Sequence, residues 1–129
     1  MDFHTPYEQA RKRDCDFIVQ YRFFSPEEGG RPTGTPMQGY RSDFMYSGDE
    51  KARQQWIIWP EFLDDKDNVI LDKSLRVPAS GKAKMWILND ALTELHKGRI
   101  KIGLKAFFME GRYIAAECEV IQIVNPNLK

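Results

Sequence analysis

Alternation of apolar and polar residues in short runs constrains the fold of this chain more than any other feature. Residues 17–23 show it most clearly, because every second position is apolar: Phe17, Val19, Tyr21 and Phe23. Successive side chains of a β-strand point to opposite faces of the sheet, so this pattern predicts a strand with one buried face. A turn cluster with one proline and two glycines follows at residues 25–30.

Comparable runs recur along the chain, at residues 40–46, 55–59, 82–88, 100–108 and 114–120. We expect Pro60 to close the run that precedes it. The last two runs are separated by Glu110-Gly111 and are predicted to form a hairpin. Because short strands dominate and a helical period is nearly absent, the sequence predicts an all-β fold, either a closed or nearly closed antiparallel barrel or a sandwich.

Two short segments are predicted to be helical. Near the N-terminus, Thr5-Pro6-Tyr7-Glu8 is typical of a helix start, with threonine as the cap and proline in the first position. We therefore expect residues 1–14 to form a short helix or a frayed arm, and residues 15–129 to form the β-barrel domain. Asn89-Asp90 is expected to cap a helical turn that Gly98 ends. A chain of 129 residues is long enough for one domain without a stabilising metal or disulfide.

The charge balance limits the classes of partner. The 19 basic residues offset the 19 acidic ones, so the net charge is zero. A protein that coats nucleic acid or a membrane through bulk charge is basic, so any such contact must come from a local patch. The first residues carry charges where a secretory signal needs an apolar stretch, and no run is long enough for a membrane span. We expect a cytoplasmic protein with no membrane partner.

Sequence motifs for nucleotides and metals are incomplete. Gly34 and Gly39 have the spacing of a phosphate loop, but Tyr40 and Arg41 follow them in place of the lysine and hydroxyl residue that bind phosphate and magnesium. The acidic turn at residues 64–68 lacks the later ligands of a calcium loop. We therefore expect no cofactor and no metal.

Nucleophilic catalysis is not expected either. The only histidines are His4 and His96, and His96, beside Lys97 near the end of a helical turn, is predicted to face solvent. Cys15 and Cys118 are each flanked by acids, which raise the pKa of a thiol and make it less reactive. Neighbouring barrel strands could bring the cysteines together as a redox pair, but buried reduced thiols are the favoured interpretation. The sequence therefore predicts a protein that is not an enzyme.

The main electrostatic feature is a predicted basic stripe. Four basic residues share one parity and are expected to project from one strand face: Lys97, Arg99, Lys101 and Lys105. Arg31, Arg41 and Arg112 lie in or beside loops, and together with the stripe they could meet phosphate groups. The alternative is the solvated outer face of a barrel, with Glu117 and Glu119 neutralising the stripe.

The segment Glu28-Gly29-Gly30-Arg31, followed by Gly39-Tyr40-Arg41, resembles the opening of the C-terminal β-barrel domain of translation elongation factor Tu. The closing hairpin of that domain is similar to the stretch from Gly103-Leu104-Lys105 through Glu110-Gly111-Arg112 to Val120. The resemblance extends over residues 15–124. It implies a six-stranded antiparallel Greek-key barrel without a catalytic residue.

The resemblance also implies where contacts lie. In the full factor, a Gly-Gly-Arg loop and a Glu-Gly turn touch the T stem of aminoacyl-tRNA. The matching positions here are Arg31, Glu110, Gly111 and Arg112. The sequence departs from the family at Pro32, where the family has histidine, and it contains neither the GTPase domain nor the second barrel. GTP-dependent delivery of tRNA is therefore not expected.

Two functions are left open. The first is a free-standing module that binds a protein (a component of the translation machinery, a toxin or a second copy of itself), because aromatic residues exceed what a small barrel interior can hold. These aromatic residues are Tyr40, Trp56, Trp59, Trp86 and Phe107. The second is RNA binding through loop arginines and the basic strand face. The candidate binding residues are Arg31, Arg41, Lys101, Lys105, Glu110, Gly111 and Arg112.

Overall fold

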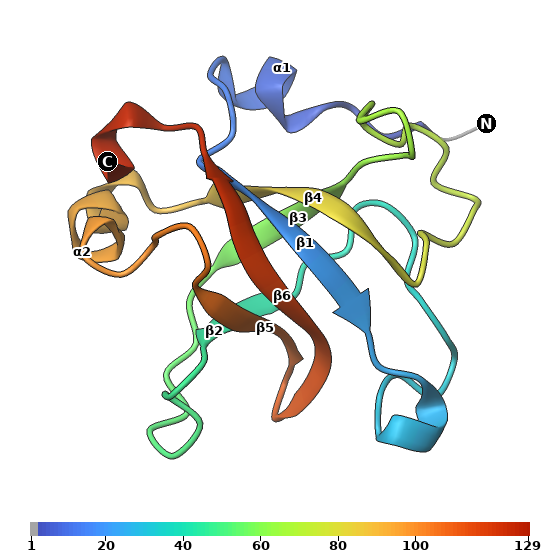
Figure 1. Ribbon diagram of the computed structural model, residues 1–129. Helices are drawn as coiled ribbons and strands as arrows, with labels where there is room; N and C mark the ends of the chain where they lie inside the picture. Colours follow the sequence, from blue (N-terminus) through green and yellow to red (C-terminus); the bar gives the residue numbers. More distant parts are fainter. Residues whose placement is uncertain (1–2) are drawn as a thin grey trace.

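A computed structural model describes residues 3–129 and consists mainly of β-structure, with little helix (Figure 1). The strands are β1 (Phe17–Phe23), β2 (Asp43–Tyr46), β3 (Ile58–Phe62), β4 (Ser80–Ile87), β5 (Lys105–Glu110) and β6 (Tyr113–Ile123). The helical elements are α1 (Tyr7–Arg11), α2 (Thr93–Lys97) and the 3₁₀ turns η1 (Pro26–Glu28), η2 (Asp90–Leu92) and η3 (Pro126–Leu128). None of the helices that residues 3–129 form is long and apolar enough to cross a membrane.

The six strands form one curled antiparallel sheet in the order β2-β5-β6-β1-β4-β3. β1 and β6 run side by side through its middle, while α1 lies above the sheet in the view and α2 lies to the left, near the C-terminus (Figure 1). The curl brings the two edges toward each other. Phe44 of β2 and Trp56, just before β3, exchange two backbone hydrogen bonds of 2.9 and 2.8 Å. The predicted β-class is thus confirmed as a curled six-stranded antiparallel sheet.

The inner side of the sheet holds a core rich in aromatic rings. The side chains of β1 that the alternation places on one face are all buried: Phe17, Val19, Tyr21 and Phe23. Tyr21 packs edge-to-face on Phe62 of β3, with 5.1 Å between ring centres, and its hydroxyl donates to the Pro78 carbonyl at 2.9 Å. The alternation therefore identified the buried face of β1 correctly.

Pro60 lies in the middle of β3, so the prediction that it closes this strand is wrong. An edge strand tolerates proline because its missing N–H can face away from the neighbouring strand, and β3 is an edge strand. The side-chain amide of Gln38 occupies part of the open side of β3. Its Nε2 donates to the carbonyls of Phe62 and Ile70 at 2.9 Å each, and its Oε1 accepts from the Phe62 N–H at 2.9 Å. Gln38 thereby satisfies backbone groups that would otherwise be available to another chain.

Residues 100–104 do not belong to a strand, contrary to the alternation in the sequence. Ile100 is buried, but Ile102 is 69 % exposed and Gly103 has a φ of 92°, so the chain turns before β5 begins. The Gly103 N–H donates to the Val120 carbonyl at 2.8 Å, which holds this turn against the end of β6. The turn separates α2 from β5 and decides where the predicted basic stripe lies.

Both predicted helical segments are present, and their caps differ in outcome. The cap residue of α1 is Pro6, with no side-chain cap, so the predicted role of Thr5 is wrong. Asn89 caps η2 as expected, because its side chain accepts from the Ala91 N–H at 3.1 Å, and Gly98 is the C-cap that follows α2.

Candidate functional site

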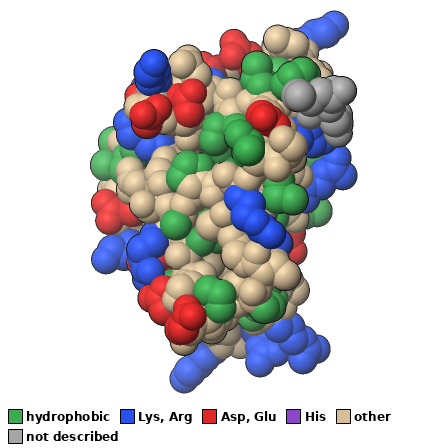
Figure 2. Space-filling view, turned by 90° about the vertical axis from the view of Figure 1, so that its right-hand side faces the viewer, with side chains coloured by type: hydrophobic (Ala, Val, Ile, Leu, Met, Phe, Trp, Pro, Cys, Tyr) green, Lys and Arg blue, Asp and Glu red, His purple; other side chains and the backbone are tan. Residues whose placement is uncertain are grey.

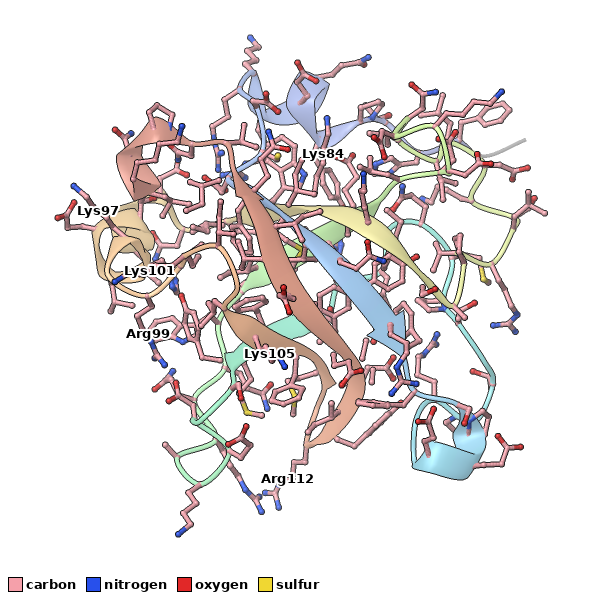
Figure 3. The ribbon with its side chains drawn as sticks, in the orientation of Figure 1. Lys84, Lys97, Arg99, Lys101, Lys105 and Arg112 are labelled. Atoms are coloured by element: carbon pink, nitrogen blue, oxygen red, sulfur yellow. The ribbon has the colours of Figure 1, made fainter. Side chains whose placement is uncertain are left out.

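The predicted basic stripe does not form one strand face. Lys97 ends α2, Arg99 and Lys101 lie in the turn after it, and Lys105 is the first residue of β5. Figure 3 shows these side chains in separate places: a group near α2, Lys105 in front of the sheet, and Arg112 at the β5–β6 turn. The prediction of a stripe is wrong because the chain turns between α2 and β5, so shared parity does not mean a shared face.

Arg99 is held in an ion pair with Asp49. Its Nη1 lies 2.8 Å from Asp49 Oδ2 and its Nη2 lies 3.3 Å from Oδ1, while the guanidinium stacks 3.8 Å from the centre of the Tyr46 ring. The hydrogen bonds between the two side chains raise the pKa of Arg99 and lower the pKa of Asp49. Arg99 therefore ties the loop after β2 to the turn after α2, and is not free to bind a phosphate.

His96 is buried, so the prediction that it faces solvent is wrong. It is 1 % exposed, its Nδ1 lies 2.6 Å from the Tyr46 hydroxyl oxygen, and the Trp56 ring stands perpendicular to its imidazole at 4.9 Å between ring centres. Burial, and then the positive charge of Arg99, lower the pKa of His96 to about 4, so the ring is neutral at pH 7. The short helix α2 turns this side chain toward β2, a packing that the neighbouring Lys97 does not predict.

The structure brings together two residues that the sequence singled out, Arg31 and Glu110. Arg31 Nε lies 2.6 Å from Glu110 Oε1, and the Tyr40 hydroxyl donates to the same oxygen at 2.5 Å. The Tyr113 hydroxyl donates to Glu110 Oε2, and the Arg31 guanidinium lies over the Tyr40 ring at 5.3 Å. Burial, followed by the hydrogen bond to Glu110, raises the pKa of Tyr40. This cluster ties the loop before β2 to the β5–β6 turn.

The remaining loop candidates lie on two different surfaces. Gly111 has a φ of 57° in the β5–β6 turn, its carbonyl accepts from Gln55 Nε2 at 2.9 Å, and Arg112 beside it is exposed. Arg41 does not join the cluster around Glu110. Its guanidinium lies 4.6 Å from the centre of the Trp59 ring, on the outer side of β3. Sequence reasoning missed this second surface because no local pattern links Arg41 to a tryptophan of a distant strand.

A groove of about 450 Å³ crosses the outer face of the sheet. Two rows of outward side chains border it, one made of Gln20, Glu119 and Lys105 and the other of Arg22, Glu117 and Phe107. Within each row the residues are register partners on β1, β6 and β5. Between the rows lie Tyr21, Cys118 and Ala106. Their side chains point into the core on the opposite face of the sheet, so their backbone forms the floor of the groove. Ser47, after β2, and Ser80, on β4, lie at the two ends of the groove.

The two rows differ in how their charges are paired. Arg22 Nε lies 3.0 Å from Glu117 Oε1, and its Nη1 lies 3.0 Å from Glu28 Oε1. Glu119 and Lys105 are direct register partners in the other row, yet their side chains have no ion pair or hydrogen bond within residues 3–129. Phe107, two residues beyond Lys105 on β5, is half-buried. Among the residues that the structure describes, the groove thus presents a carboxylate and an ammonium group without ion-pair partners, together with an aromatic ring.

Cys15 and Cys118 are buried and free, as predicted, but they do not form a pair. Cys118 is the register partner of Tyr21, and the extended chain from Cys15 to Tyr21 spans about 20 Å. The two cysteines are therefore too far apart to form a disulfide. Burial raises the pKa of Cys15 to about 12 and also raises the pKa of Cys118, so both thiols are protonated at pH 7. Within residues 3–129, no three His, Cys, Asp or Glu side chains are grouped so that they could hold a metal ion.

Sequence reasoning found several members of the groove without finding the groove. Lys105, Phe107, Glu117 and Glu119 were each singled out, whereas Gln20 was not. The signal that could have found the groove is the outward half of each alternating run, which holds all of its border residues. No family model matches the sequence, and no curated protein matches it. The groove and the cluster around Glu110 are therefore the features that point to a function.

Proposed function

We propose that this chain is a non-enzymatic protein-binding module on a six-stranded Greek-key β-barrel similar to the C-terminal barrel of elongation factor Tu. The barrel is supported by the bridge between Phe44 and Trp56, which links the two edges of the curled sheet. The Greek-key connection is supported by the sheet order, because β1 and β2, and also β4 and β5, are consecutive in the chain but are not neighbours in the sheet. The non-enzymatic role is supported by the burial of every histidine and cysteine within residues 3–129, since a nucleophile and its base must reach a substrate.

The groove across β5, β6 and β1 is the observation that carries this proposal. Its two rows are one pleat apart along each strand, which is about 7 Å. It extends from the β2 side of the sheet to β4, which is about 19 Å at the usual spacing between strands. These dimensions accommodate one extended protein segment of about six residues lying across the strands.

The charges of the groove define the partner segment. In the partner, a lysine or arginine would pair with Glu119 and an acidic residue would pair with Lys105. An apolar side chain of the partner would pack against the Phe107 ring. Arg22 is already bound to two acids and contributes shape rather than an open charge. The partner is therefore a protein segment of mixed charge that carries an apolar residue.

Ion pairs hold the loops around the groove in place. Arg22 joins η1 to one row through Glu28, and Glu110 joins the loop before β2 to the turn that follows β5. A surface whose loops are already ordered loses less conformational entropy when a partner binds. The cluster around Glu110 thus supports binding through preorganisation rather than through direct contact.

A photo-crosslinking amino acid, p-benzoylphenylalanine, at position 107 of the full chain tests this proposal in cells. We expect a covalent adduct of higher mass that protease removes and nuclease does not. Exchanging the two open charges, with Glu119→Lys and Lys105→Glu, is expected to lower the adduct yield by at least about fivefold. The same probe at Leu95, which is 46 % exposed on α2, is the matched control. Equal adducts at both positions, or no adduct at position 107, would contradict the proposal.

RNA binding through Lys101, Lys105 and Arg112 is the alternative proposal. These side chains have no ion pair within residues 3–129, whereas Arg31 and Arg99 are held by acids. Figure 2 shows another face of the molecule, on which positive and negative side chains are both present. Lys105 itself is the register partner of Glu119, so its surroundings carry mixed charge rather than a basic field, which favours a protein partner. Titration with tRNA at low salt tests the alternative. Binding that weakens steeply as salt rises supports it, and the lack of any binding contradicts it.

A further inference from the structure

The N-terminal segment covers the outer face of β3 and β4 (Figure 1). We call residues 3–11 the arm, and the side chains of Trp59, Glu61 and Trp86 beneath it the seat. Glu61 is 1 % exposed and Trp86 is fully buried. Both point outward from the sheet, since Phe62, next to Glu61, points into the core. The arm therefore shields a carboxylate and an indole that the sheet itself leaves on its outer side.

Glu61 is the anchor of the arm. Its Oε2 lies 2.6 Å from His4 Nε2 and accepts from the Tyr7 N–H at 2.8 Å. Its Oε1 accepts from the indole N–H of Trp86 at 3.1 Å. Two of these three partners belong to the arm. A buried carboxylate that lost them would need water or an equivalent donor in their place.

Aromatic contacts complete the seat. The Tyr7 ring is perpendicular to Trp86 with 5.9 Å between ring centres, and it is tilted against Trp59 at 6.4 Å. It also stands perpendicular to the His4 ring at 4.9 Å. The seat thus recognises a segment that carries an imidazole and, three residues later, an aromatic side chain.

The rest of the arm is held weakly. α1 has five residues and none of them is buried, and a helix of this length is unstable on its own. Phe3 is 56 % exposed, so its apolar surface is largely unused. The backbone of His4 donates to the Leu71 carbonyl at 2.8 Å, and Arg11 Nη2 donates to the Leu88 carbonyl at 3.2 Å. Most of the attachment therefore depends on the seat.

The arm ends at a strained hinge. Lys12 has a φ of 56° and a ψ of 38°, in the left-handed region that residues other than glycine rarely adopt. Its N–H donates to the Glu8 carbonyl at 2.9 Å. Extending the chain at Lys12 would release this strain and carry the arm away from its own seat.

We infer that the seat is an exchangeable binding site whose second occupant is the arm of another copy of this chain. Two chains would swap arms reciprocally, so that His4 and Tyr7 of each chain contact Glu61 of the other. The contacts are the same between chains as within one chain, so the cost is the entropy of association. Within one chain the arm competes at an effective concentration on the order of millimolar. Monomers therefore prevail at micromolar concentration and exchanged dimers form toward millimolar, whether or not the groove binds a partner.

Two substitutions at Lys12 in the full chain test this inference. Lys12→Pro is incompatible with a φ of 56° and removes the N–H that bonds to Glu8, so it disfavours the closed arm. Lys12→Gly adopts the same φ without strain and is the matched control. We expect size-exclusion chromatography with light scattering to place the dimer midpoint of Lys12→Pro at least about tenfold lower in concentration than that of Lys12→Gly. Adding His4→Ala and Tyr7→Ala to Lys12→Pro is expected to restore the monomer.

Two results would overturn the inference: Lys12→Pro staying monomeric up to about 1 mM with a native near-UV circular dichroism spectrum, or its dimer persisting after both arm substitutions. If Lys12→Pro does not fold, a mixture of two other full-length variants decides the matter. Glu61→Gln damages the seat and leaves the arm intact, while His4→Ala with Tyr7→Ala damages the arm and leaves the seat vacant. Native mass spectrometry is expected to show a one-to-one heterodimer in the mixture and monomers in each sample alone. A mixture that contains only monomers rules out exchange.

Discussion

Asp16 joins three segments of the chain through one buried carboxylate, so its removal tests how this fold is held together. The residue is completely buried. Its carboxylate accepts from the Ile87 N–H at 2.7 Å, from Asn125 Nδ2 at 2.8 Å and from Arg13 Nη1 and Nη2 at 3.1 and 3.2 Å. These donors come from the N-terminal segment, the end of β4 and the chain after β6.

Asp16→Ala is expected to lower the free energy of unfolding by about 3–5 kcal/mol, because it removes the buried partner of the Arg13 ion pair and takes this acceptor from the Ile87 N–H and Asn125 Nδ2. A domain of this kind has a total stability of about 5–15 kcal/mol, so the loss is a large fraction of it. With a urea dependence of about 2 kcal/mol per molar, the midpoint of unfolding is expected to fall by about 1.5–2.5 M.

Urea unfolding followed by tryptophan fluorescence measures this shift. Asp65→Ala, in an exposed turn, is the matched control and is expected to change the stability by less than about 0.5 kcal/mol. A loss below about 1 kcal/mol for Asp16→Ala, with an unchanged urea dependence, would refute the reasoning, because the carboxylate would then contribute no more than one ordinary hydrogen bond.

Three further predictions concern His96, the two cysteines and Gly30. His96 takes up a proton near pH 4 in the folded state and near pH 6.5 in the unfolded state, so the stability of the fold falls as the pH drops from about 6.5 to about 4. Between pH 7 and about 4.5, urea titrations should show that wild type loses about 2–3 kcal/mol more stability than His96→Gln. Equal losses in the two proteins would exclude a neutral buried His96. Because burial raises the pKa of Cys15 and Cys118, neither thiol should react with Ellman's reagent at pH 8 until urea unfolds the chain, and rapid labelling of the folded protein would contradict this. A Cβ on Gly30 would lie 2.1 Å from the Phe24 carbonyl oxygen, so Gly30→Ala should lower the free energy of unfolding by about 3 kcal/mol. Gly29 has open space around it but a φ of 90°, so Gly29→Ala should lower the free energy of unfolding by about 1 kcal/mol. Thermal unfolding that ranks the two variants in the reverse order would contradict the predicted clash.

The period of the apolar pattern was sufficient to predict most strands and their buried faces. It succeeded for β1 and for β6 because alternation depends on neighbouring residues alone. It failed at residues 100–104, where an apolar residue at every second position continues through a turn. It also misplaced the end of β3, because Pro60 is compatible with an edge strand and the sequence does not show which strands are edges.

For the candidate binding residues too, local patterns predicted which residues matter but not which contacts they make. Arg31 and Glu110 were identified from motifs, but their ion pair joins two loops that no local pattern connects. The burial of His96 depends on Tyr46 and Trp56, which belong to other parts of the sheet. The contact of His4 with Glu61 likewise depends on where the N-terminal segment docks.

Most strands, their inward and outward faces, the charge neutrality and the lack of a nucleotide or metal motif were predictable from the amino-acid order, because each depends on nearby residues or on composition. The groove, the buried imidazole and the seated arm were not. Arg22 and Glu117, for example, are 95 residues apart in the chain, and they border the groove together because β1 and β6 pair in one particular register. Such pairing is decided by the packing of the whole sheet, since many alternative registers satisfy the same local pattern and the shared core selects among them.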